Sequence, residues 1–285
     1  MKVLDFHLHY NGKLDEAQIL VDKWTEAGIS KGVAFAVNFD DGSYTTVKQM
    51  ADLAEKYPDF IIPFAYGIPG RVDVIAEIEE AAQAGFKGIK FLYPAKPYDD
   101  DEYFPIYEAA AKAGMVCLFH TGMVLGNVGK GGLHGVAFQK DWRVSADYMR
   151  PMRLDRIARS FPEMTIVGAH CGSEAYYEEA TSMFNWQTNV YMDMSIGQFH
   201  WWDKSKPDGS DEALPIKTRI MDLRNSGQLD LNRILFGTDA VLGNPEASPT
   251  FGLRTLRIEM AGLNATDEEK ENVAWNTAAR ILEIE

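Results

Sequence analysis

Short apolar segments alternate along this chain with longer segments that have helical spacing. The apolar segments are rich in β-branched and aromatic residues and are bounded by Gly, Pro or polar clusters, which is typical of strands in a parallel sheet. The segments between them, such as DEAQILVDKWTEAG and VDVIAEIEEAAQAG, are amphipathic, and several end at Gly or Pro as helices do. The pattern predicts eight strands, at residues 3–10, 32–39, 61–68, 88–94, 115–122, 164–172, 190–195 and 234–240.

Eight strand–helix units predict an α/β protein that forms a (β/α)8 TIM barrel. The 285 residues suit one closed barrel, so we expect a single domain over residues 1–285. A doubly wound open sheet is the alternative. It has no support from a phosphate-binding loop, because the sequence contains neither GxGxxG nor GxxxxGK[ST].

Two connections are long, at residues 123–147 after the fifth strand and 197–217 after the seventh. Loops of this length in a compact barrel are usually lids or binding loops, so we expect both to overhang the C-terminal mouth. They carry several cations and aromatic residues: Lys130, His134, Trp142, Arg143, His200, Trp201, Trp202 and Lys204.

Composition narrows the class of protein and of partner. Apolar residues make up 46% and charged residues 25%, and no apolar run is long enough for a membrane helix. The net charge of −14 disfavours nucleic acid and leaves a small molecule as the expected partner. No signal peptide is recognisable after Met1, and Cys117 and Cys171 lie in apolar runs, so we expect a cytoplasmic protein without disulfides.

Polar residues recur late in the predicted strands. His7 and His9 share one face of their strand and lie about 7 Å apart along it. By the same alternation His120 shares a face with Leu118, His170 with Gly168 and Ile166, and Asp239 with Gly237. Catalytic groups of a barrel gather at the C-terminal strand ends, so we expect these side chains to meet.

Imidazoles with one carboxylate suit Zn²⁺, Fe²⁺ or Mn²⁺. A single strand histidine is more often structural, but matching positions on four strands favour a metal or catalytic role. A divalent ion lowers the pKa of a water toward about 7, and a neighbouring imidazole can carry the proton. Asp239 can act as ligand, base or both.

Six segments together resemble the amidohydrolase superfamily, specifically its amidohydrolase-2 group of metal-dependent TIM-barrel hydrolases and decarboxylases. They are DFHLHY, GIKFLYPAKPYDDDEYFPIYEAAAKAGMVCLFHTG, LDRIARSFPEMTIVGAHCG, VYMDMS, RILFGTDA and NTAARILEI, and the resemblance covers essentially the whole chain. It implies one divalent metal, with Zn²⁺ preferred, bound by His7, His9, His120 and Asp239. It also implies that His170 is the catalytic acid/base, with Asp239 sharing in catalysis.

Lys90 bears on the number of metals, because related enzymes with two metals bridge them through a carboxylated lysine on the fourth strand. The GIK context is more similar to members with one metal or none. We therefore expect one metal, with Lys90 unmodified and either contacting an anionic substrate or pairing with a carboxylate.

Further candidates surround this set. Arg150, Arg143 and Lys130 can clamp a substrate carboxylate, although for any one of them solvated surface charge is the more common role. Trp201 and Trp202 can wall the mouth or bury against a second subunit of a homo-oligomer. Asp5 and Asp193 are candidates to hydrogen-bond a ligand imidazole.

Three functions remain open at this point. The preferred one is hydrolysis of a lactone, amide or ester-like bond of a small anionic molecule by metal-activated water. The alternative is non-oxidative decarboxylation of a small aromatic or unsaturated acid on the same site. The weakest is a catalytically idle barrel that acts as a binding module.

Overall fold

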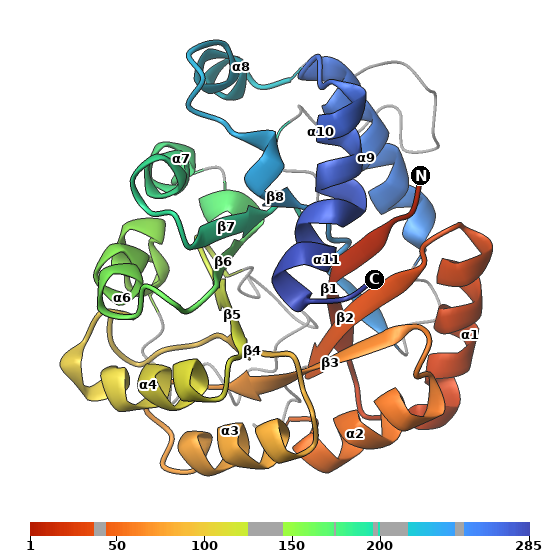
Figure 1. The fold of residues 1–285 in the computed structure, drawn as a ribbon, viewed down its shortest axis with the longest axis vertical. Coiled ribbons are helices and arrows are strands. Elements are labelled where there is room, and N and C mark those ends of the chain that lie inside the picture. Colours follow the sequence, from red (N-terminus) through yellow and green to blue (C-terminus); the bar gives the residue numbers. More distant parts are fainter. Residues whose placement is uncertain (37–43, 125–144, 174, 196–198, 200–215, 243–247) are drawn as a thin grey trace, which may run out of the picture.

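The structure is a computed structural model that describes residues 1–36, 44–124, 145–173, 175–195, 199, 216–242 and 248–285. In this part of the chain nine parallel strands form one sheet in the order β8-β7-β6-β5-β4-β3-β2-β1-β9, with helices around it (Figure 1). The strands are β1 (Leu4–Tyr10), β2 (Lys31–Ala36), β3 (Ile61–Gly67), β4 (Gly88–Phe91), β5 (Val116–His120), β6 (Ile166–Ala169), β7 (Val190–Asp193), β8 (Ile234–Leu235) and β9 (Ala240–Leu242). The α-helices are α1 (Leu14–Glu26), α2 (Val47–Lys56), α3 (Val74–Gln83), α4 (Phe104–Lys112), α6 (Leu154–Ser160), α7 (Tyr177–Trp186), α8 (Thr218–Asn225), α9 (Pro249–Gly262), α10 (Asp267–Glu271) and α11 (Thr277–Leu282).

The sheet closes on itself between β1 and the segment that contains β8 and β9. β8 pairs with β7, whereas β9 pairs with β1. Between them the Phe6 amide donates to the Phe236 carbonyl at 2.8 Å and the Asp239 amide to the His7 carbonyl at 2.9 Å. The predicted TIM barrel is therefore confirmed, but the predicted eighth strand at 234–240 is two short strands with a break at the candidate aspartate.

Gly237 lies in this break because a side chain there has no room. A Cβ at Gly237 would lie 2.7 Å from the Cβ of His7 and 3.3 Å from that of Ser195. Nonbonded carbons favour separations of about 3.5–4.0 Å. The absence of a side chain at Gly237 thus lets the closing segment lie directly against the histidine strand.

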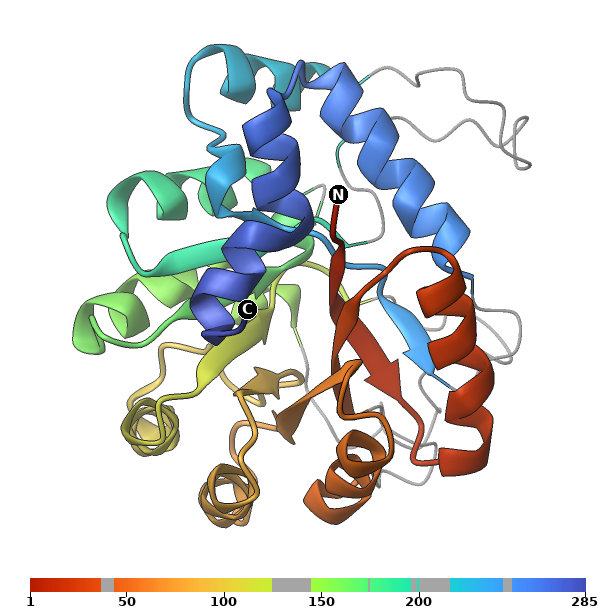
Figure 2. The same cartoon turned by 45° about the vertical axis from the view of Figure 1, so that its right-hand side comes forward.

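Two apolar layers hold the barrel together. The inner layer fills the lumen with alternate residues of the strands, namely Leu4, Phe6, Val33, Phe35, Ile62, Phe64, Val116, Leu118, Val167, Ala169 and Leu235. Trp275 and three residues of α11 belong to the same cluster, so the last helix covers the N-terminal end of the barrel (Figures 1 and 2). The outer layer packs the other strand face against the surrounding helices. This arrangement leaves the C-terminal strand ends for polar side chains.

Of the two long connections predicted to overhang that end, 125–144 and 200–215 lie outside the described residues, as do 196–198. Among the helices that the structure describes, none combines the length and the apolar composition that crossing a lipid bilayer requires.

Candidate metal centre

Two histidines of β1 and the aspartate before β9 form the centre of the candidate site. His7 Nε2 lies 3.1 Å and His9 Nε2 lies 3.0 Å from one oxygen, Oδ1 of Asp239. These three ligand atoms lie close enough together to hold one ion. The structure thus brings together three of the four predicted ligands, from segments 230 residues apart.

An irregularity in β1 turns the two histidines inward. Leu4 and Phe6 fill the lumen, whereas Leu8 and Tyr10 belong to the outer apolar layer. The pairing of β1 with β2 shifts register between Asp5 and Leu8, so the inward face changes from even to odd positions. Beyond the shift, the rings of His7 and His9 both contact Phe35 of the lumen, at centroid distances of 5.0 and 4.7 Å.

The other ring nitrogens fix how the histidines face Asp239. His7 Nδ1 lies 2.7 Å from Asp193 Oδ2, and His9 Nδ1 lies 3.3 Å from the Ala36 carbonyl oxygen. Both partners accept hydrogen bonds, so each neutral ring carries its proton on Nδ1 and turns the lone pair of Nε2 toward Asp239. Two lone pairs and a carboxylate oxygen then face one point, where a cation stabilises all three. The donor set fits a divalent metal.

Asp193, the last residue of β7, links two imidazoles. Its Oδ2 binds His7, and its Oδ1 accepts the His170 amide N–H at 2.9 Å. Ser195 Oγ lies 2.6 Å from Asp193 Oδ1 and 2.6 Å from His170 Nδ1. The hydrogen bond predicted between Asp193 and an imidazole is present at His7, whereas the role of His7 as a metal ligand stays a prediction. The parallel prediction for Asp5 is wrong, since its carboxylate binds the His7 amide, Trp24 and Thr238 instead.

His170 reaches the cluster through its backbone conformation, not through strand alternation. β6 ends at Ala169, and Ile166, the residue predicted to share its face, packs in the outer layer. His170 has a φ of 62°, which turns its ring to within 4.9 Å of the His7 ring and 4.7 Å of the His120 ring, between centroids. Asp239 likewise has a φ of 57°. Left-handed residues other than glycine are uncommon and concentrate at functional sites.

His120, the fourth predicted ligand, lies beside the three-atom group and not within it. Its ring packs against His170, and its Nε2 lies 3.4 Å from the Met123 carbonyl oxygen. A role for His120 as ligand stays a prediction. Its position at the end of β5, paired in register with Ala169 of β6, keeps it at the same edge of the barrel.

Lys90 of β4 is fully buried below the histidines. Its Nζ lies 3.4 Å from His7 Nε2 and 5.1 Å from the centroid of the Phe35 ring. Burial lowers the pKa of this ammonium to about 8, although the carboxylates of Asp193 and Asp239 act in the opposite direction. Within the described residues Lys90 forms no ion pair with a carboxylate, so the expected pairing is not found and contact with a substrate stays a prediction.

Burial sets the charges of the remaining groups. It lowers the pKa of His170 to about 3 and that of His120 well below its usual range, so both rings are neutral at neutral pH. Burial alone would raise the pKa of Asp239 and of Asp193, but the neighbouring imidazoles hold both well below the usual range. His120 and His170 are therefore neutral beside ionised carboxylates. Burial acts to lower the pKa of His7, but Asp193 and Asp239 raise it overall, so a metal at this ring would compete with a proton.

Apart from Lys90, the predicted substrate contacts fall outside this cluster or outside the described residues. The Arg150 guanidinium binds the Glu179 carboxylate of α7 and lies 3.3 Å from Asp147 Oδ1. Arg143 and Trp201 lie outside the described residues, as do Lys130, His134, Trp142, His200, Trp202 and Lys204. All of these substrate roles stay predictions.

Ser195 is the residue of the cluster that the sequence analysis missed. A signal for it exists in VYMDMS, because a hydroxyl two positions after Asp193 is within reach of the carboxylate. Serine after a strand is common, so the signal becomes specific only when His170 is seen to approach.

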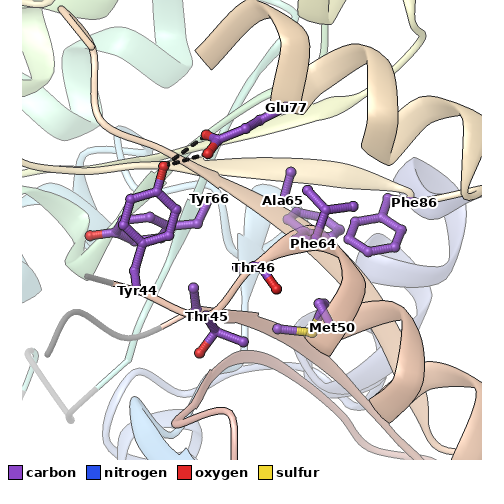
Figure 3. Close-up of a pocket in the computed structure, with 11 residues that line it drawn as sticks. Tyr44, Thr45, Thr46, Met50, Phe64, Ala65, Tyr66, Glu77 and Phe86 are labelled. Atoms are coloured by element: carbon purple, nitrogen blue, oxygen red, sulfur yellow. Dashed lines mark hydrogen bonds between the residues drawn. The ribbon is translucent and has the colours of Figure 1, made fainter. Parts of the chain in front are cut away.

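A small cavity beside β3 is separate from the metal centre. Tyr44, Thr45, Met50 and Tyr66 are among its lining residues, and neither a histidine nor Asp239 belongs to them (Figure 3). The Tyr44 hydroxyl lies 2.7 and 2.8 Å from the two Glu77 oxygens, so these polar groups pair with each other.

Comparison with known proteins identifies the family and the fold. A family model described as amidohydrolase matches residues 5–284. No curated protein matches the chain.

Three of the solved structures with the same fold illustrate the range of relatives. An uncharacterized TIM-barrel protein from Bordetella bronchiseptica is 19% identical, with a TM-score of 0.67 and 99% of each chain covered. A 5-carboxyvanillate decarboxylase from Sphingomonas paucimobilis is 13% identical, with a TM-score of 0.59, 100% of this chain and 99% of that chain covered. A probable 2-pyrone-4,6-dicarboxylic acid hydrolase from Acinetobacter baumannii is 11% identical, with a TM-score of 0.60 and 100% of each chain covered.

At these low sequence identities the likeness establishes only the shared barrel fold. The three structures include both a hydrolase and a decarboxylase. The family match covers nearly the whole chain, including every residue of the histidine and aspartate cluster. The chain therefore belongs to the amidohydrolase family.

Proposed function

We propose that this protein is a metal-dependent hydrolase that acts on a lactone, amide or ester-like bond of a small anionic molecule. The observation that carries the proposal is the convergence of His7 Nε2 and His9 Nε2 on one oxygen of Asp239. Two imidazoles and a carboxylate that leave coordination positions open favour Zn²⁺, with Mn²⁺ or Fe²⁺ as alternatives. A bound ion of this kind supplies Lewis acidity, which lowers the pKa of a water and polarises a carbonyl.

The protein's own side chains then orient the reactants and handle the proton. His170 is the candidate acid/base, because its ring packs against the His7 ring beside the proposed ion. Asp239 is ionised and borders the same space, so it both binds the ion and accepts a hydrogen bond. Asp193 fixes the ring of His7 through the 2.7 Å hydrogen bond at Nδ1.

Lys90 supports an anionic substrate within this proposal. Its ammonium is fully buried beside His7 and makes no ion pair with a described carboxylate. An anionic substrate oxygen would offset the cost of burying that charge. Arg150, Arg143 and Trp201 are proposed as further substrate contacts, and His120 is proposed as the remaining metal ligand.

Non-oxidative decarboxylation is the second candidate. It is favoured by the likeness to the 5-carboxyvanillate decarboxylase from Sphingomonas paucimobilis and to a 2,6-dihydroxybenzoate decarboxylase from Rhizobium, both with TM-scores of 0.59. Asp239, His170 and Lys90 serve this reaction as well, because a substrate carboxylate is also an anion that a metal and an ammonium attract.

The deciding experiment compares both reactions in one preparation. The protein is stripped with a chelator, reloaded with Zn²⁺, Mn²⁺ or Fe²⁺, and incubated with lactones and with hydroxybenzoate-type acids. We expect lactone opening that depends on the metal and falls by at least about a hundredfold in Asp239→Asn, since a metal ligand and proton acceptor is lost. CO₂ release without lactone opening would overturn hydrolysis in favour of decarboxylation.

A metal titration tests the idle barrel. A catalytically idle barrel predicts that the purified protein binds no divalent ion and that chelation leaves its thermal midpoint unchanged. We expect instead a bound ion, retained by a Lys112→Ala control on the exposed end of α4 and lost in Asp239→Asn.

A further inference from the structure

Ser195 lies two residues beyond the end of β7 and is fully buried. Its hydroxyl oxygen is 2.6 Å from His170 Nδ1 and 2.6 Å from Asp193 Oδ1. The Ser195 amide N–H donates to the same Asp193 oxygen at 3.1 Å. The backbone thus holds the hydroxyl between a carboxylate and an imidazole.

The count of donors around Asp193 decides which way the hydroxyl proton points. Asp193 Oδ1 accepts the amide N–H groups of His170 and Ser195, and Oδ2 faces the ring N–H of His7. A carboxylate with donors at both oxygens is an acceptor, so the single hydroxyl proton of Ser195 lies toward Asp193. The reverse arrangement would place two lone pairs 2.6 Å apart with no proton between them.

With its proton given to Asp193, the Ser195 oxygen accepts a hydrogen bond from His170 Nδ1. We propose that Ser195 is a positioning residue that transmits the charge of Asp193 to His170 and holds that ring as the Nδ1–H tautomer. His170 Nε2 is then unprotonated. Asp193 in this way sets the tautomers of two rings, His7 directly and His170 through a hydroxyl.

The tautomer matters because only an unprotonated ring nitrogen can accept a proton or bind a metal. Without the Ser195 oxygen, Nδ1 loses its acceptor and the Nε2–H form becomes populated. Loss of one such hydrogen bond changes a tautomer ratio by roughly tenfold. The role in turnover rests on the proposed function, whereas the tautomer itself does not.

Imidazole ¹⁵N NMR of the metal-free protein tests the tautomer, because protonated and unprotonated ring nitrogens have well-separated shifts. The chain has six histidines, and His170→Gln identifies the signals of His170. We expect a protonated Nδ1 and an unprotonated Nε2 in the wild type, a shift toward the other tautomer in Ser195→Ala, and the wild-type pattern in Ser195→Thr. A wild-type proton on Nε2, or a Ser195→Ala spectrum that equals the wild type, overturns the proposal.

Ser182→Ala is the matched control, because the Ser182 hydroxyl donates at 2.7 Å to the Glu178 carbonyl of its own helix. It removes the same atom and should leave the His170 signals unchanged. If the added methyl of Ser195→Thr prevents folding, the His170 signals of Ser195→Ala and Ser182→Ala are compared without it. The proposal then requires that the signals change in the first variant and not in the second.

Kinetics of the metal-loaded protein test the role in turnover. We expect Ser195→Ala to lower kcat by roughly 10–100-fold with KM nearly unchanged, as for other residues that orient a ligand or base. A mixed tautomer with full kcat would overturn the positioning role. Failure of the proposed function is seen separately, as a wild type that turns over no substrate while its His170 signals still show the Nδ1–H form.

Discussion

Gly237→Ala is the sharpest test of how the barrel positions the metal centre. The new Cβ would lie 2.7 Å from the Cβ of His7 and 3.5 Å from its amide nitrogen. Because nonbonded carbons favour about 3.5–4.0 Å, the two segments must separate by about 1 Å. Both contacts involve atoms close to the backbone, so a side-chain rotation cannot relieve them.

Two effects follow from that displacement. Overpacking of this kind costs about 1–3 kcal/mol of unfolding free energy, which corresponds to a fall in thermal midpoint of about 2–12 °C for a chain of this size. A shift of about 1 Å in His7 also exceeds the roughly 0.5 Å that a binding geometry tolerates. We therefore expect metal affinity to fall by about tenfold or more.

Thermal unfolding of the metal-free protein measures the first effect, and competition with a chelator of known affinity measures the second. Gly262→Ala is the control, since its Cβ would meet Ile216 at 2.5 Å and none of the three atoms nearest to that Cβ belongs to a histidine. It should destabilise the protein and leave metal affinity unchanged. A Gly237→Ala protein that loses stability but binds metal as tightly as the wild type would refute the reasoning, because His7 would then be displaced without consequence.

Three further predictions concern the same cluster. Zn²⁺ at a hundred times its Kd should add about 2.7 kcal/mol to the unfolding free energy, and a chelator should abolish this stabilisation. An unchanged thermal midpoint would contradict a metal site that exists in the folded protein. Asp193→Asn should lower metal affinity by roughly 10–100-fold in a chelator competition, because His7 loses a charged partner at Nδ1; equal affinity would mean that the 2.7 Å contact does not orient the ring. In denaturant titrations the unfolding free energy of the metal-free protein should fall as the pH falls below about 6.5. The pKa values of His120 and His170 are lowered in the folded state, so below that pH the unfolded chain binds more protons than the folded one. Each histidine then lowers the unfolding free energy by about 1.4 kcal/mol per pH unit. The raised pKa of His7 acts in the opposite direction, but the pKa of His9 is lowered like those of His120 and His170, so three rings outweigh one. Stability that stays flat between pH 7.5 and 5.5 would show that these three rings are not held neutral.

The fold followed from local patterns, because each strand and helix carries its own spacing of apolar residues. The order of the strands and the closure of the barrel agree with that prediction. The eighth strand was predicted as continuous over ILFGTDA because this segment begins with an apolar run, yet the strand breaks at Gly237 and Asp239. Pattern alone cannot show that a backbone contact with His7 excludes a side chain there.

Residues of the candidate site could be identified from the sequence where they lie close together along the chain, and less readily where they lie far apart. HxH on one strand identified His7 and His9, although the alternation with Phe6 is interrupted by a register shift that leaves no mark in the sequence. His170 was assigned to the site by strand alternation, and the structure reaches the same result through a left-handed residue after the strand has ended. Ser195 acts through a contact with a residue 25 positions away, which no local pattern encodes.

The contact between β1 and the closing segment also governs when the centre can exist during synthesis. His9 and Asp239 are 230 residues apart, and β1 acquires its second neighbour only when residues 236–242 are available. A nascent chain that lacks this segment has two histidines on a strand with an open edge and does not yet have Asp239, the carboxylate on which both Nε2 atoms converge. A site that contains all three side chains therefore exists only after residues 236–242 have been added, when β1 to β8 have already had time to pair.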